Sequence, residues 1–128
     1  MAGTIAADTL THSSAGSIAT NYVVEGSAKC WANFNGTGTV SIRDSFNAAS
    51  LTDNGTGNYS INFSNSFSNN DYSSIGFAYP HGSWNQIPQC QIHSSQTTSL
   101  TKFWSGASTS GTLNDTSLHN HSVHGDLA

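Results

Sequence analysis

The chain has 128 residues, enough for one domain with a core, and a formal net charge of -4 with only 8% of its residues charged. Its three basic residues, Lys29, Arg43 and Lys102, are scattered along the sequence. This argues against nucleic acid as a partner, because phosphate binding requires clustered Lys and Arg side chains. No apolar run approaches the roughly 18 residues of a membrane-spanning helix, so we expect no membrane span.

Ser, Thr, Asn and Gly together make up almost half of the sequence. Such a composition fits either a disordered chain or a β structure whose outer faces carry hydroxyl and amide groups. Disordered chains usually lack aromatic residues and carry high net charge. The three Trp, four Tyr and six Phe residues, together with the small net charge, therefore favour a folded β protein.

Residues 1–27 are thinly apolar and show no strong periodicity, with Ile5, Leu10 and Ile18 separated by small polar residues. A frayed terminus explains this pattern, and so does an arm that becomes ordered against a neighbouring subunit. The low charge favours the arm, since solvated tails are usually more charged. We predict an extended N-terminal arm for attachment or assembly over residues 1–27, and a β-sandwich domain over residues 28–128.

From residue 28 onward, strand signals recur about every 8 to 12 residues, the spacing typical of a sandwich or barrel. Turns such as Asn35-Gly36-Thr37-Gly38 separate them, because glycine and asparagine tolerate the positive φ of a tight turn. No window shows a convincing helical period. We predict an all-β fold, an antiparallel β-sandwich that is jelly-roll-like. The expected strands span residues 28–34, 38–43, 46–52, 57–64, 71–79, 89–93, 97–104 and 116–125.

Apolar and polar residues alternate within most of these strands, which indicates one buried face. Ser60 and Asn62 are expected to face solvent. The stretch from Ile75 to Tyr79 differs, because it belongs to a strand that is apolar on both faces, which predicts a central strand or a subunit contact. The predicted core side chains are Val40, Ile42, Tyr59, Ile61 and Phe63.

The segment from Ala28 to Phe63 contains the runs Ala-Lys-Cys-Trp, Asn-Phe-Asn-Gly-Thr-Gly, Arg-Asp-Ser-Phe-Asn and Thr-Asp-Asn-Gly-Thr-Gly-Asn-Tyr. These runs resemble a pattern that recurs in tailed-bacteriophage virion proteins of the tail fibre, collar and other structural types. The matching residues are Ala28, Lys29, Trp31, 33–38, 43–47 and 52–59, and the match departs at Cys30, where the pattern more often has alanine.

The resemblance implies a non-enzymatic structural protein on the surface of a phage virion, made in the host bacterial cytoplasm. It is either tail fibre-like or a capsid decoration (cement) protein: the short chain favours decoration, and the usual labels of the similar proteins favour a fibre. The resemblance also implies a homotrimer, because fibres and many capsid decorations sit on threefold axes. Capsid or tail proteins of the virion are the other implied partners.

The sequence contains no motif that pairs two carboxylates, no nucleophile elbow and no phosphate-binding loop, so we expect neither an enzyme nor a cofactor. His119 and His121 are the candidate metal ligands, since a His-x-His pair on a strand points to one face. His81 and His93 are possible further ligands for zinc. We nevertheless predict no metal site, with His119, His121 and His124 as neutral, half-exposed side chains on a polar strand.

Trp31, Trp84 and Trp104 are candidates for an interface or for a carbohydrate platform, while tryptophan is more often a core or interface residue. If the tryptophans form a carbohydrate platform, the alternative function follows. The protein is then a lectin-like receptor- or glycan-binding module at a fibre tip, with a host-surface glycan as partner. Cys30 and Cys90 both fall on strand patterns. Two reduced, buried thiols are expected in a bacterial cytoplasm, and a disulfide is possible if the strands are neighbours.

Overall fold

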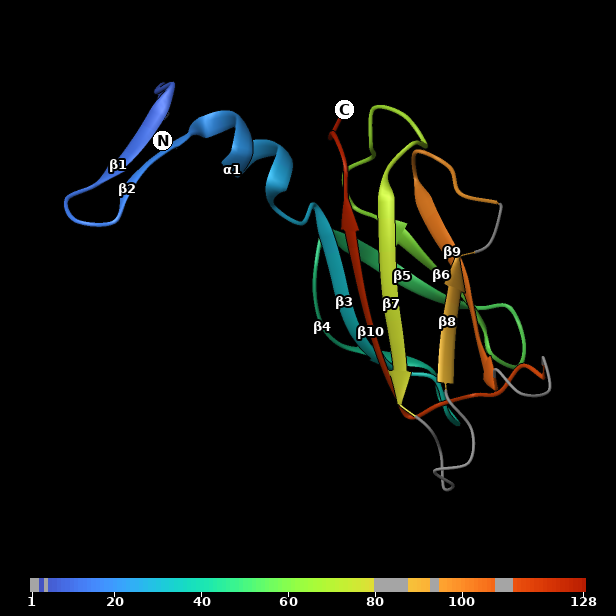
Figure 1. Cartoon of the computed structure of the whole chain (residues 1–128). Helices are drawn as coiled ribbons and strands as arrows, with labels where there is room; N and C mark the ends of the chain where they lie inside the picture. The colour runs from blue at the N-terminus through green and yellow to red at the C-terminus, as the bar shows by residue number, and fades with distance from the viewer. Residues whose placement is uncertain (1–2, 4, 80–87, 93–94, 108–111) are drawn as a thin grey trace.

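The computed structural model describes residues 3, 5–79, 88–92, 95–107 and 112–128, and within them it holds ten strands and one short helix (Figure 1). The fold is mostly β, as the sequence predicts. The elements are β1 (Thr9–His12), β2 (Gly16–Ala19), α1 (Thr20–Gly26), β3 (Cys30–Asn35), β4 (Ser41–Phe46), β5 (Ala48–Asp53), β6 (Asn58–Phe63), β7 (Ser73–Tyr79), β8 (Pro88–Ile92), β9 (Leu100–Ala107) and β10 (Leu118–His124).

Eight strands form two four-stranded antiparallel sheets, with the orders β4-β3-β10-β7 and β5-β6-β9-β8. The two sheets form two layers in Figure 1, and β7 and β8 lie side by side. Each of the eight strands predicted from residue 28 onward is present, and their antiparallel pairing is confirmed. The predicted boundaries differ most at β4 and β9, which begin at Ser41 and Leu100 rather than at residues 38 and 97.

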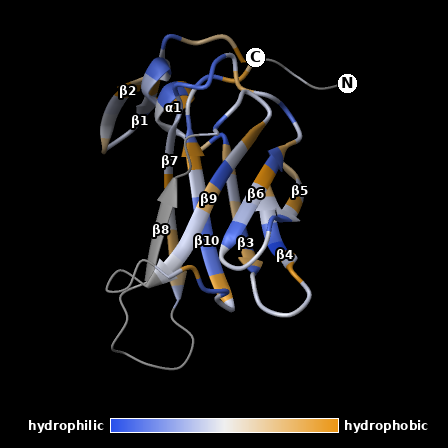
Figure 2. Ribbon diagram, turned by 90° about the vertical axis from the view of Figure 1, so that its right-hand side faces the viewer, coloured by the Kyte–Doolittle hydropathy of each residue, from blue (hydrophilic) through white to orange (hydrophobic). Residues whose placement is uncertain are grey.

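The core lies between the two sheets. Phe34 of β3 packs against Tyr59 of β6 and Phe103 of β9, with ring centroids 5.4 and 5.7 Å apart. Strands of both sheets carry hydrophobic residues interspersed with hydrophilic ones (Figure 2), as expected when only one face of each sheet is buried. The buried cluster is Cys30, Ala32, Phe34, Tyr59, Ile61, Phe63, Phe67, Tyr72, Phe103 and Val123.

Three of the five predicted core residues, Tyr59, Ile61 and Phe63, belong to this cluster. Val40 and Ile42 are only partly buried and pack against it from outside. The reason is their position in the sheet. Ile42 lies on β4, an edge strand, and Val40 lies in the turn before it, so neither is covered on all sides.

Two expectations about individual strands are wrong. Ser60, expected to face solvent, is only 6% exposed, and the Asn54 side chain donates a hydrogen bond to its hydroxyl at 2.8 Å. Strand β7 is an edge strand of its sheet rather than a central one. Its outward side chains Ile75, Phe77 and Tyr79 are exposed, and such an apolar face indicates contact with a partner or a ligand.

The hydroxyl groups of two tyrosines join the sheets to each other. Tyr59 of β6 donates to the main-chain oxygen of Gly36, which follows β3, at 2.8 Å. Tyr72, which precedes β7, donates to the main-chain oxygen of Leu100 at the start of β9, at 2.7 Å. Both hydroxyls bond groups from the opposing sheet, so each holds the two layers in a fixed relation.

Residues 9–26 do not form the single extended arm that was predicted. Strands β1 and β2 pair as a hairpin, and α1 follows directly (Figure 1). The hairpin turn is favoured locally: the His12 Nδ1 accepts hydrogen bonds from the main-chain N–H groups of Ser14 and Ala15, and Gly16 adopts φ +92°. The hairpin and helix project away from the two sheets and contain no buried residue.

We expect Tyr59→Phe to lower the free energy of unfolding by about 1–3 kcal/mol, because the substitution leaves buried hydrogen-bond acceptors without a donor. Urea denaturation of the purified protein measures this. Tyr22→Phe is the matched control, since Tyr22 is exposed on α1, and its effect should stay within about 0.5 kcal/mol. Equal effects of the two substitutions would show that the Tyr59 hydroxyl does not stabilise the sheet junction.

Candidate functional site

Two of the three histidines of β10 lie in the core, and the third, His124, is half-buried. His119 and His121 are 1% and 4% exposed. The ring of His119 stacks on Phe34 at 4.4 Å, and the ring of His121 stacks on Phe103 at 4.4 Å. The expectation of half-exposed rings is therefore wrong for His119 and His121 and agrees with the position of His124. The inward face of β10 carries His119, His121 and Val123, so a strand that reads as polar in sequence contributes aromatic rings to the core.

Each histidine uses its Nε2 atom in a hydrogen bond. His119 bonds the Thr116 hydroxyl and His121 bonds the Ser74 hydroxyl, both at 2.6 Å. Burial lowers the pKa of both imidazoles to about 4, and for His119 the nearby Asp115 opposes this shift. Both rings are therefore neutral at pH 7.

These contacts give the histidine pair a packing role. Within the described residues, no cluster of three or more His, Cys, Asp or Glu side chains is arranged to hold a metal ion. His81 and His93, the possible further ligands, lie outside the described residues. In the part of the chain that is described, the two Nε2 atoms of the pair bond hydroxyl groups, and the two Nδ1 atoms are buried without a hydrogen-bond partner.

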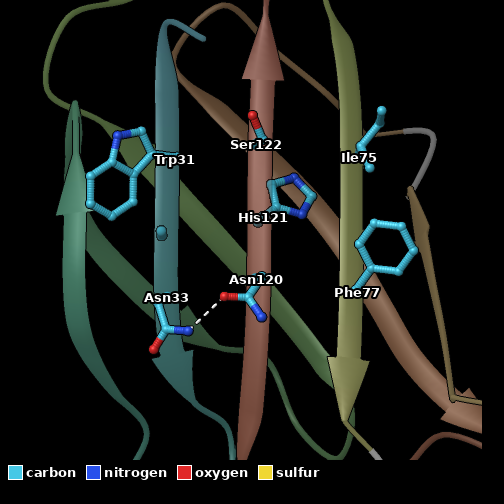
Figure 3. A pocket seen from close by; sticks show the side chains of 8 residues that line it. Trp31, Asn33, Ile75, Phe77, Asn120, His121 and Ser122 are labelled. Carbon is cyan, nitrogen blue, oxygen red and sulfur yellow. Dashed lines mark hydrogen bonds between the residues drawn. The ribbon is translucent and has the colours of Figure 1, made fainter.

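The outer face of the sheet β4-β3-β10-β7 carries a shallow groove of about 280 Å³ (Figure 3). Trp31 of β3 forms one wall, and Ile75 and Phe77 of β7 form the other. Asn120 and Ser122 of β10 lie between the walls as the floor. We refer to this feature as the β10 groove.

Strand register brings the groove residues together. Trp31 pairs with Ser122 across β3 and β10, and Ser122 pairs with Ile75 across β10 and β7. The next outward row joins Asn33, Asn120 and Phe77 in the same way. Since paired residues on neighbouring strands point to the same face, both rows project outward side by side.

The polar part of the β10 groove is an amide pair. The Asn33 side-chain nitrogen donates to the Asn120 side-chain oxygen at 2.6 Å. In the described part of the chain, the Asn33 Oδ1 and the Asn120 Nδ2 have no further hydrogen-bond partner, so the Asn33 oxygen can accept and the Asn120 nitrogen can donate further hydrogen bonds. The groove lining contains no charged side chain. Apolar walls with a few polar groups are typical of small-molecule sites.

The three tryptophans do not form the shared platform that was considered. Trp31 faces outward from β3, between the buried Cys30 and Ala32. Trp104 faces outward from β9, between the buried Phe103 and Ser105, and so lies on the opposite side of the molecule. Trp84 is outside the described residues.

Cys30 is a free thiol buried in the core, and burial raises its pKa to about 12. This places it among unreactive packing residues, because the thiolate is the reactive form of cysteine. Cys90 lies on β8, and its side chain is outside the described residues.

Sequence reasoning did not single out Asn33 or Asn120 as site residues. They lie 87 positions apart in the chain, and each is one of thirteen asparagines. The exposed apolar stretch on β7 was the available signal, because an unexplained apolar face on a strand indicates a contact surface.

Comparison of the chain with protein-family models, with curated proteins and with solved structures finds no match. The part of the chain that the structure describes has no helix of the length and apolar character needed to cross a membrane.

We expect the free energy of unfolding to fall as pH falls from about 6.5 to about 4. The pKa of both buried histidines is lowered from the ordinary 6.5 to about 4, so within this window the unfolded chain binds protons that the native state does not. The stability contributed by the neutral rings is complete above the window and is lost through it. Urea denaturation at a series of pH values measures the slope.

The variant His121→Phe tests the origin of this slope, because it removes one titrating group and keeps an aromatic ring beside Phe103. Its unfolding free energy should depend less on pH than that of the natural protein. Tyr22→Phe, on the exposed helix α1, is the control and should keep the natural slope. An unchanged slope in His121→Phe would contradict the assignment.

Proposed function

We propose that this protein is a non-enzymatic structural protein on the surface of a phage particle, made in the host bacterial cytoplasm. The proposal rests on the structural role of the residues whose sequence resembles the phage virion pattern. These residues form turns, sheet junctions and core contacts. A recurring pattern of this kind specifies a framework, and its presence supports the view that this chain uses the same framework.

Two residues of the pattern illustrate this work. The Arg43 guanidinium donates to the main-chain oxygens of Phe34 and Ser117, at 3.2 and 2.5 Å, and so ties β4 to β3 and to the segment before β10. Asn47 adopts φ 55° where the chain passes from β4 to β5, and its side chain bonds the main chain of Asn65. Asparagine is among the few residues that enter this conformation readily.

The pattern also places two glycines where a side chain has no room. A Cβ at Gly36 would lie 2.6 Å from the Tyr59 hydroxyl. Gly57 has φ +60°, and a Cβ there would collide with the main-chain oxygen of Ser105. Both glycines therefore serve the framework through close backbone approach rather than through ligand binding.

We further propose that the two sheets form a β-sandwich that is jelly-roll-like. The core between the sheets supports the sandwich. The arrangement of β7 to β10 supports a Greek-key connection, since β8 and β9 pair, β7 lies beside β8, and β10 returns to pair with β7. Jelly rolls contain two such units within about eight strands.

The N-terminal hairpin and helix are the proposed attachment element. A two-stranded hairpin is at best marginally stable alone, and so is a helix shorter than about 12 residues. Here neither buries a residue against the sheets, and Leu10, Ile18, Tyr22 and Val24 are all exposed. We propose that this segment packs against a sister subunit, in a homotrimer, or against another capsid or tail protein.

The proposal includes two positions on the virion, the head and the tail. The short chain favours a head decoration protein, because a fibre needs a long shaft or a separate adaptor. The usual labels of the virion proteins that the segment from Ala28 to Phe63 resembles favour a tail fibre. Electron microscopy of the parent particle with an antibody to this protein separates the two positions.

The β10 groove favours a second candidate function, a lectin-like module that binds a glycan on the host surface. Trp31, Ile75 and Phe77 give it apolar walls, and the Asn33–Asn120 pair gives it free hydrogen-bonding groups. This function is compatible with the first, because the groove and the N-terminal segment are different parts of the chain.

Deletion of residues 2–26 is expected to leave a folded β domain that no longer enters phage particles, because the hairpin and helix are lost and the two sheets keep their contacts. Circular dichroism of the purified variant measures folding, and quantitative mass spectrometry of purified particles measures incorporation. Incorporation of the shortened chain at normal occupancy would place the attachment surface in the sheets instead.

A matched pair within α1 sharpens the test. The double variant Val23→Ser and Val24→Ser removes exposed apolar groups and should reduce incorporation. The double variant Asn21→Ser and Glu25→Gln changes polar groups of the same helix and should not reduce incorporation.

Light scattering of the free natural protein should also give a mass above 13.4 kDa at micromolar concentration. A monomer, unchanged by addition of particle proteins, would contradict self-association.

A further inference from the structure

We propose that the β10 groove binds the end of an uncharged glycan, with a sugar ring held between Trp31 and the Ile75–Phe77 wall and its hydroxyl groups bonded to Asn33 and Asn120. This inference rests on the second candidate function and deepens it by naming the site and the class of sugar.

The walls suit the apolar faces of a sugar ring. Trp31 is 38% exposed and Phe77 is 71% exposed, so both rings offer area that is otherwise in water. They lie on β3 and β7, which are separated by β10 and therefore by about 10 Å, twice the spacing of neighbouring strands. The C–H groups of a pyranose ring carry partial positive charge and pack favourably on the negative faces of aromatic rings. A groove of about 280 Å³ accommodates the end of a glycan rather than a long polymer.

The amide pair suits sugar hydroxyl groups. With the Asn33 nitrogen bonded to the Asn120 oxygen, the Asn33 oxygen remains as an acceptor and the Asn120 nitrogen remains as a donor group. A hydroxyl group both donates and accepts, so two neighbouring hydroxyls of one ring satisfy both free groups. If the two amides were exchanged in orientation, one donor and one acceptor would still remain.

The same amides disfavour a second copy of this chain as the occupant. A protein surface that covered the groove with apolar side chains would leave the free amide groups buried without partners, which costs free energy. A sugar supplies both the apolar face and the hydroxyl groups within one ring. The mixed lining therefore favours a glycan over an apolar protein surface.

The surrounding charges favour a neutral sugar. No charged side chain lines the groove. Asp44 on β4 pairs with Asn33 and so lies on the same face, where its carboxylate repels uronic or sialic acids. Lys29 directly precedes β3, and its ammonium group bonds the main-chain oxygens of Val24 and Ser27. The face lacks a free cation, among its described residues, that would recognise an anionic sugar.

The test is binding of the full-length protein to an array of neutral hexose and N-acetylhexosamine oligosaccharides, together with sialylated and uronate-containing glycans. We expect retention of one or more neutral glycans. Titration of that glycan against tryptophan fluorescence then measures affinity. Phe77→Ala and Asn120→Ala should each weaken binding by about tenfold, the usual effect of removing a central contact. Both side chains project from the outer face, so the fold should persist.

Two control variants carry matched changes on the other sheet. Asn62 lies on β6 and Trp104 on β9, and Asn62→Ala and Trp104→Ala should leave glycan affinity within about twofold. Stability of each variant is checked by urea denaturation. A loss of affinity in the groove variants, with unfolding unchanged, supports direct contact with the sugar.

The remaining outcomes separate this inference from the functions on which it rests. Absence of any retained glycan overturns both the inference and the lectin-like function. Retention that is insensitive to Phe77→Ala and Asn120→Ala overturns the inference alone, as does a preference for anionic glycans. If Phe77→Ala instead converts an oligomer to a 13.4 kDa monomer and no glycan binds, the face is an interface between copies. Particle incorporation is measured separately, so its failure concerns only the virion role.

Discussion

The hydrogen bonds around the Tyr59 hydroxyl are the constraint on which the rest of the structure depends. The hydroxyl lies 2.8 Å from the Gly36 oxygen and 2.7 Å from the Asp115 carboxylate, and Asp115 also accepts the Gly57 main-chain N–H. Gly36 donates in turn to the Thr116 oxygen at 2.9 Å. One buried hydroxyl thus joins both sheets and the segment that leads into β10, and it requires two glycines because their Cβ atoms would displace it or its neighbours.

This junction determines which face of β10 carries the candidate site. Since Thr116 binds the inward-pointing His119, the alternation of β10 turns Asn120 and Ser122 outward between β3 and β7. The core thereby contains the His119 and His121 rings, which burial keeps in their neutral form. The outer face carries the Asn120 amide and the Ser122 hydroxyl. The packing of the histidines and the position of the candidate site are therefore two consequences of one strand register.

The two outer faces differ in chemistry. On the sheet β5-β6-β9-β8, Asn62 donates to the hydroxyls of Ser50 and Thr52, so its polar groups are satisfied within the sheet. On the other sheet, Phe77 and Trp31 remain exposed and the amide pair keeps free groups. A soluble domain seldom leaves such a mixed apolar and polar surface without a partner. The N-terminal segment also exposes apolar side chains, which is why we propose that it serves assembly.

The sequence by itself determined the strands and much of the core. The pattern of strand signals identified all eight strands of the two sheets and the buried Tyr59, Ile61 and Phe63 of β6, because this pattern is local, but it placed the buried Ser60 at the surface. It did not determine which strands are neighbours. Val40 and Ile42 are half-buried because β4 became an edge, and the His119 ring is buried because β10 lies between β3 and β7. The groove also depends on pairing between residues 87 positions apart. Such contacts depend on how all strands pack together, and that is information only the tertiary structure contains.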